Sequence, residues 1–107
     1  MTTTLSIDFE KYNGPVYTGR DRGVRLREQL RLDEADSVAD SVVNVFIPDT
    51  TYTVTSSFFL GLFGPSVVKA GSREQFFAKY KFKLPAFLQP DVEGYVARAL
   101  QTRNLFH

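Results

Sequence analysis

The chain has 107 residues, 43% of them apolar, and its 13 basic and 12 acidic side chains leave a formal net charge of +1. These values predict one compact domain spanning residues 1–107, and the balanced charge gives no reason to expect nucleic acid, a membrane or an acidic substrate as the partner. The absence of cysteine excludes disulfide bonds and thiolate metal sites. The first residues lack the pattern of a signal peptide and no apolar stretch is long enough to span a bilayer, so we expect a cytoplasmic protein.

The N-terminal segment alternates apolar and polar side chains with the two-residue period of a half-buried strand. Its inward-facing residues would be Leu5, Ile7 and Phe9. The dipeptide Asn13-Gly14 is a strong signal for a tight turn, and the apolar pair at 16–17 would begin a returning strand. We therefore expect an N-terminal β-hairpin.

An arginine-rich segment, residues 22–32, has the imperfect apolar stripe of a surface helix. Thr18 or Asp21 could cap its first turn. Its arginines are most simply interpreted as a solvated face, and the acidic residues after it as a solvated helix end. These acidic residues are Asp33, Glu34, Asp36 and Asp40.

The rest of the chain is expected to pack around residues 42–64. Residues 42–47 are a short, mostly β-branched run with Asn44 as its one polar member, which is typical of a strand covered on both faces. A polar loop follows, and the carboxyl ends of strands are where open α/β sheets bind ligands and partners. Ser56 and Ser57 stand where the N-cap of the next helix is expected.

The helix expected at residues 58–70 would end at Gly71, a residue suited to the left-handed conformation. Its apolar side chains cannot all face one sheet, so part of its surface is either covered by the last helix or exposed for a partner. These side chains are Phe58, Phe59, Leu60, Leu62, Phe63, Val67 and Val68.

Three further elements complete the pattern. Ser72 and Gln75 fit a capping box for a brief helical turn. Residues 78–84 alternate apolar residues with lysines, as in a strand near a sheet edge, where charge discourages unwanted pairing. Residues 90–103 have the spacing of an amphipathic helix. The predicted fold is therefore α/β, with a small mixed sheet of about four strands, an N-terminal β-hairpin and about three to four helices.

This order of elements, the segment VTSSFFLGLFG at 54–64 and the pattern GR..G..LR at 19–27 together resemble the STAS-like domain of unknown function. That family is related to the STAS domains of sulfate transporters and anti-sigma factor antagonists. The resemblance covers about residues 5–103 and implies a βαβαβα order. Its most characteristic part is the junction between the central strand and the following helix.

The resemblance also implies a regulatory module that is not an enzyme. In the wider family, a partner kinase with the histidine-kinase-like ATPase fold phosphorylates a serine that opens the second helix. That serine falls on Ser56, with Ser57 beside it. Thr55 and Phe58 replace the acid and the glycine of the usual motif, which fits the STAS-like subfamily and leaves its mechanism open.

The leading hypothesis is a non-catalytic module that docks a kinase-like ATPase or another regulatory protein through residues 49–63, without a cofactor or metal. The partner-binding residues would be Thr50, Thr51, Tyr52, Thr55, Ser56, Phe58, Phe59 and Phe63. Ser56 and Ser57 would be the phosphoacceptors. A purely capping role for both serines is the alternative.

Two other hypotheses are kept. A nucleic-acid or nucleoprotein binder would use the basic side chains of two segments, and its affinity would fall steeply with salt. These side chains are Arg20, Arg22, Arg25, Arg27, Lys79, Lys81 and Lys83. The second of these hypotheses is a homodimer that forms through the apolar helix or the edge strand. An enzyme is least expected, because the only histidine is the terminal His107 and no glycine-rich phosphate loop is present.

Overall fold

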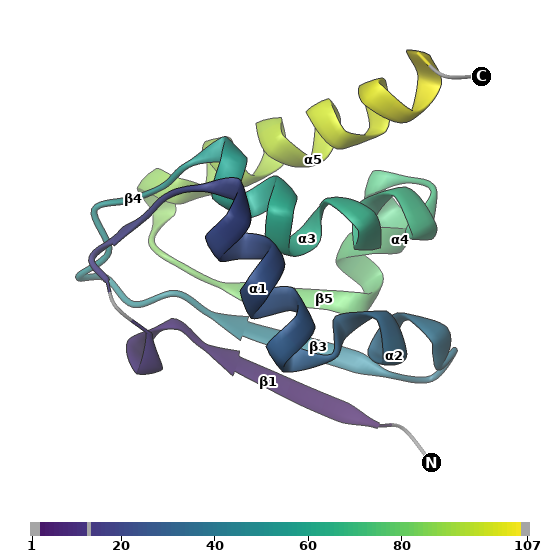
Figure 1. Cartoon of the computed structure of the whole chain (residues 1–107), viewed down its shortest axis with the longest axis horizontal. Coiled ribbons are helices and arrows are strands. Elements are labelled where there is room, and N and C mark those ends of the chain that lie inside the picture. The colour runs from purple at the N-terminus through teal and green to yellow at the C-terminus, as the bar shows by residue number, and fades with distance from the viewer. Residues whose placement is uncertain (1–2, 13, 106–107) are drawn as a thin grey trace.

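The computed structural model describes the backbone of residues 3–12 and 14–105, and the side chains of these residues up to 101. Three parallel strands form the main sheet in the order β1-β3-β5, namely β1 (Thr4–Asp8), β3 (Val42–Phe46) and β5 (Tyr80–Lys83). A second parallel sheet pairs β2 (Val16–Tyr17) with β4 (Thr53–Val54), at the end of the molecule toward which β1 and β3 point (Figure 1).

The described residues form five α-helices, which lie on one side of the main sheet (Figure 1). They are α1 (Arg20–Leu30), α2 (Leu32–Ser37), α3 (Ser56–Ala70), α4 (Arg73–Lys79) and α5 (Gln89–Leu105), with two short 3-10 helices, η1 (Phe9–Lys11) and η2 (Ala86–Leu88). The fold is thus α/β with two small parallel sheets. The prediction of one mixed sheet with three to four helices is wrong in these details, and the order of the elements is not the βαβαβα order that the STAS-like resemblance implied.

The core lies between the main sheet and α3, which packs against α1 on one side and α5 on the other. Burial alternates along β3: Val43 and Val45 are buried, whereas Asn44 is exposed on the face without helices. The prediction that this strand is covered on both faces is therefore wrong. The reason is topological, because the helices that follow β1 and β3 return on the same side of the sheet.

The predicted N-terminal β-hairpin is also wrong. β1 pairs in parallel with β3, and β2 pairs in parallel with β4, so β1 and β2 belong to different sheets. The hydroxyl of Tyr17 donates to the carbonyl of Phe9 at 2.7 Å. This bond holds together the two ends of the segment that joins β1 to β2. Asn13, half of the expected turn dipeptide, lies outside the described residues.

Most of the locally encoded elements are confirmed. α1, α3 and α5 occur where helices were expected, and α3 ends at Gly71 with a left-handed φ of 90°. Ser72 caps α4, and β5 is an edge strand whose Lys81 and Lys83 point to the face without helices. Lys79 belongs to α4, because the helix is longer than the single turn expected. α2 was not predicted.

The start of α1 differs from the expectation. Gly19 precedes the helix with a positive φ of 94°, and neither Thr18 nor Asp21 occupies the N-cap position. None of the described helices combines the length and the apolar character needed to cross a membrane.

Gly94, in the interior of α5, offers a direct test of this helix. A Cβ built at this position meets no atom within 4 Å, and the residue does not have a positive φ. We expect Gly94→Ala to raise the free energy of unfolding by about 0.5 to 1 kcal/mol, because alanine loses less backbone entropy when a helix forms. Urea denaturation would measure this gain. A lower midpoint than that of the wild type would contradict the position of Gly94 on an open face.

Candidate functional site

The carboxyl ends of β1 and β3 border a hollow of about 630 Å³. Its walls are mainly aromatic and proline side chains, which are Phe9, Tyr12, Pro15, Tyr17, Pro48 and Tyr52. Ligands and partners of open α/β sheets bind at this end of the strands. The predicted loop therefore lies where the topology favours a functional site.

Hydrogen bonds hold residues 48–57, the β3–α3 segment, in place. The amide of Tyr52 donates to the carbonyl of Pro15 at 2.9 Å, and the amide of Thr55 donates to the carbonyl of Tyr17 at 2.9 Å. A third bond, from the amide of Thr51 to the carbonyl of Pro48 at 3.0 Å, closes a turn. The β2–β4 pairing thus converts the predicted loop into an ordered segment.

Thr55 caps α3, which corrects the prediction that Ser56 or Ser57 does so. The Oγ1 atom of Thr55 accepts a hydrogen bond from the amide of Phe58 at 3.3 Å. The sequence favoured the two serines, but the bond from the amide of Thr55 to the carbonyl of Tyr17 makes Thr55 the last extended residue before the helix.

Ser56 and Ser57 consequently occupy the first turn of α3. No hydrogen bond to either side-chain hydroxyl is found among the described residues. Ser57 is exposed and Ser56 is half-buried. The structure therefore leaves the hydroxyl of Ser57 more accessible to a modifying enzyme than that of Ser56.

The residues predicted to bind a partner fall into two groups. Tyr52 is 75% exposed and Thr50 is also exposed, while Thr55 and Ser56 are half-buried. The buried group is Thr51, Phe58, Phe59 and Phe63. The prediction that this second group contacts a partner is wrong. α3 lies at the centre of the helical layer and turns its three aromatic rings toward the core, and Thr51 is buried before this helix begins.

Thr51 differs from the other buried polar residues. Its Oγ1 atom is enclosed and has no hydrogen-bond partner among the described residues. Thr51 also lines the hollow.

The predicted basic residues do not form one surface. The guanidinium of Arg22 lies 5.1 Å from the ring centre of Tyr17. Lys79 donates to the carbonyl of Val38 at 2.9 Å. Lys81 and Lys83 lie on the face of the main sheet opposite α1, which carries the exposed Arg20 and Arg25.

Arg27 is the largest departure from the prediction of a solvated arginine face, because only 7% of it is exposed. Its guanidinium donates to the carbonyl of Leu62 at 2.9 Å and to Oγ of Ser66 at 2.8 Å. It also pairs with Asp36 at 3.0 Å and with the exposed Asp33 at 2.6 Å. The sequence contained a signal for this burial, since Arg27 follows Gly23 by four residues and falls within the apolar stripe of α1.

The side chain of Asp36 is likewise buried, with 5% of it exposed, which corrects its assignment to a solvated helix end. Its carboxylate accepts hydrogen bonds from the hydroxyl of Tyr80 at 2.6 Å and from Oγ of Ser66 at 2.5 Å. Burial, followed by the hydrogen bond to Asp36, raises the pKa of the Tyr80 phenol well above its ordinary value. We refer to Arg27, Asp36, Ser66 and Tyr80 as the Arg27 network, which joins α1, α2, α3 and β5.

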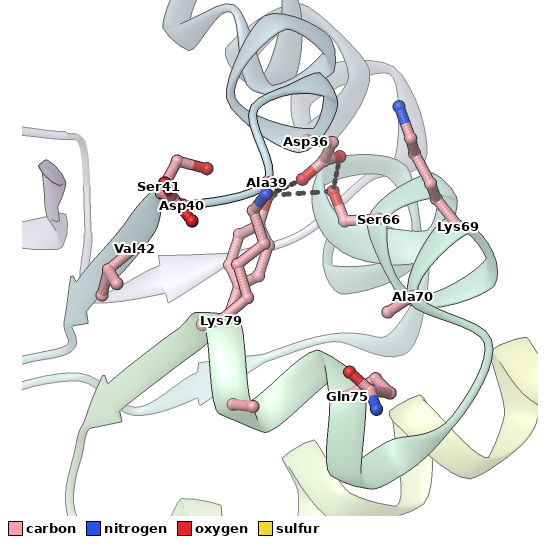
Figure 2. Close-up of a pocket in the computed structure, with 12 residues that line it drawn as sticks. Asp36, Ala39, Asp40, Ser41, Val42, Ser66, Lys69, Ala70, Gln75 and Lys79 are labelled. Carbon is pink, nitrogen blue, oxygen red and sulfur yellow. Dashed lines mark hydrogen bonds between the residues drawn. The ribbon is translucent and has the colours of Figure 1, made fainter. Parts of the chain in front are cut away.

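A second hollow, of about 440 Å³, lies beside this network at the amino ends of β3 and β5. Figure 2 shows the side chains of Asp36 and Ser66 pointing toward each other at one side of it, while Lys69 points away from them. Every polar side chain of the network has partners within it. These side chains are therefore explained as connections between elements of the fold.

The network also lacks the parts of a nucleophilic site. Ser66 donates its proton to a carboxylate that already accepts from Tyr80 and Arg27, so no free base activates it. The chain's one histidine, His107, lies outside the described residues. Across the described ranges, no group of three or more acidic, histidine or cysteine side chains is arranged to hold a metal ion.

No protein-family model, curated protein or solved structure matches the chain. The fold and the site by themselves define a two-layer α/β protein with an ordered polar segment at the carboxyl ends of its strands. The STAS-like resemblance stays a prediction.

Proposed function

We propose that this protein is a non-catalytic, STAS-like regulatory module that docks a protein partner through the exposed residues of the β3–α3 segment. The observation that carries the proposal is the exposure of Tyr52, which is the most exposed large hydrophobic side chain among the described residues. Its backbone is fixed by the bond to Pro15. An aromatic side chain on a rigid backbone is a favoured anchor in protein interfaces, since little entropy is lost when it is buried.

The proposed partner is a kinase-like ATPase or another regulatory protein, as the STAS-like resemblance implies. Ser57 is the preferred phosphoacceptor, with Ser56 as the second candidate. α3 has no acidic residue in its first turn, so its N-terminal amides and dipole would favour a phosphate there. The added charge would then change the surface next to Tyr52 without disturbing the fold.

Affinity capture from native extract would test the docking surface, with Tyr52→Ala compared against Phe87→Ala. Phe87 is an exposed aromatic residue of η2 and provides a matched control for the loss of apolar surface. We expect the wild type and Phe87→Ala to retain the same protein and Tyr52→Ala to lose it. Equal recovery by all three would contradict the docking surface. Incubating the wild type with candidate ATPases and ATP, followed by peptide mass mapping, would test phosphorylation separately.

The charge preference of the α3 N-terminus can be measured without a partner. We expect Ser57→Asp to stabilise the protein by about 0.3 to 1 kcal/mol at low ionic strength and Ser57→Lys to destabilise it by a similar amount. Urea denaturation at low and high salt would measure both effects, which salt should reduce. Thr50→Asp and Thr50→Lys are controls outside the helix. Identical stabilities of the two Ser57 variants would contradict a favourable anion position at this turn.

A further inference from the structure

A groove crosses the outer surface of the helical layer between α3 and α5, with a volume of about 450 Å³. Its apolar walls are Leu60, Gly64, Pro65 and Val68 of α3 and Ala99 of α5. Val68 is 38% exposed and Pro65 is also exposed. The groove is therefore the part of the wide apolar surface of α3 that the neighbouring helices leave open.

Gly64 deepens the groove. A Cβ built there would have only side-chain atoms of Leu60 near it, the closest at 3.8 Å. The absence of a side chain at Gly64 thus leaves space between Leu60 and Val68, which lie one helical turn to either side of it. The volume falls in the range of pockets that hold small molecules.

Among the residues whose side chains the structure describes, two charged ones line the groove, and both are cations. Arg20 begins α1 and its carbonyl packs against Gly61, whereas Lys69 lies eight residues further along α3. At a rise of about 1.5 Å per residue, the two cations flank a length of about 12 Å of α3. The described lining of the groove contains no acidic side chain to neutralise them.

We propose that this groove binds an anionic amphiphile, a small molecule with an alkyl chain and a carboxylate-type headgroup. The apolar walls of α3 and α5 would bury the alkyl chain, because removing it from water is favourable. Arg20 or Lys69 would hold the headgroup by a charge-assisted hydrogen bond. The same two cations disfavour a cationic amphiphile. This site uses none of the residues assigned above to partner docking, so it stands independently of that function.

Decanoate, kept below its micellar concentration, is a suitable probe for an NMR titration of the full-length protein. We expect saturable shifts of the amide signals of Leu60, Gly64, Val68 and Ala99. Decyltrimethylammonium has the same chain with the opposite charge and should bind about tenfold more weakly, because each cation of the groove repels it. Equal affinities for the two amphiphiles, or shifts confined to other residues, would overturn the proposal.

Charge-reversal variants separate the groove from general electrostatics. Arg20→Glu combined with Lys69→Glu should weaken decanoate binding about tenfold, because the groove then repels the carboxylate. Lys81→Glu combined with Lys83→Glu makes the same change in net charge on the face without helices and should leave binding unchanged. All four side chains are exposed, so both variants should fold. Equal losses in the two variants would show non-specific attraction and overturn the site.

Discussion

Replacing Asp36 by alanine should lower the free energy of unfolding by about 3 kcal/mol or more, because it leaves the buried guanidinium of Arg27 without its buried counter-ion. The hydroxyls of Ser66 and Tyr80 lose their acceptor in the same variant. Asp33 still pairs with Arg27 but is itself 88% exposed, so it compensates the lost charge only in part. Urea denaturation would measure the loss.

Asp33→Ala is the matched control for this prediction. It removes a carboxylate from the same guanidinium, but from the solvent side, and should cost less than about 1 kcal/mol. If the two variants had equal stabilities, the burial of the Arg27–Asp36 pair would not determine the strength of the network.

A second variant tests whether the instability of Asp36→Ala comes from the unpaired charge of Arg27 or from the loss of packing at residue 36. Arg27→Met combined with Asp36→Leu removes both charges and keeps the existing hydrogen bond between the hydroxyls of Ser66 and Tyr80, which are 3.0 Å apart. We expect this double variant to recover most of the stability lost in Asp36→Ala, as replacement of a whole buried ion pair by apolar side chains often does. A double variant as unstable as Asp36→Ala would show that shape, and not charge, makes Asp36 necessary.

Gly23→Ala should also destabilise the protein strongly, by about 1 to 3 kcal/mol, through a clash between α1 and α3. A Cβ at Gly23 would overlap the carbonyl oxygen of Phe58 and lie 2.9 Å from the amide nitrogen of Leu62. Both atoms belong to the backbone of α3, so no side-chain rotation relieves the contact. The helices would have to separate. Thermal and urea denaturation would measure the loss.

The reciprocal position supports the same expectation. A Cβ at Gly61 would overlap the carbonyl oxygen of Arg20 and lie 3.2 Å from the amide nitrogen of Val24. Gly94→Ala is the control, because the same change in an open helical position should stabilise the protein. Stabilisation by Gly23→Ala as well would mean that helix propensity outweighs the contact and that the two helices are not held at this distance.

The two predictions concern one interface and should not be additive. Arg27 of α1 donates to the carbonyl of Leu62 in α3, one turn away from the contact of Gly23 with that helix. Separating the helices would stretch this bond, so Gly23→Ala already weakens part of the Arg27 network. The loss in the combined Gly23→Ala and Asp36→Ala variant should therefore be smaller than the sum of the single losses.

Local patterns predicted much of the secondary structure. The apolar run of β3, the alternation in β5, the spacing of α5 and the glycine that ends α3 each depend on residues close together in the chain. When one face of a helix or strand is buried, apolar residues recur with the period of that element, whichever element covers the face. The polar loop expected after β3 contained Tyr52, which is exposed, but it also contained Thr51, which is buried.

Residues 9–17 and 55–57 show where local patterns were insufficient. The turn signal at residues 13–14 favoured a hairpin, but the parallel partner of β2 is β4, far along the chain. The choice of Thr55 as the cap of α3 depends on the same distant pairing, through the bond to Tyr17. A competition between local and long-range hydrogen bonds cannot be read from a window of a few residues.

The sequence alone determined that the chain is cysteine-free with nearly balanced charge, and its local patterns predicted the α/β class and the apolar faces of β5 and α5. Only the tertiary structure decided what each face meets. It placed Arg27 and Asp36 inside the protein and Phe58, Phe59 and Phe63 in its core, and it left Tyr52 and Ser57 outside. The physical reason is that burial depends on which elements pack together, and gathering the helices on one side of the sheet brings distant residues into contact that no local period encodes.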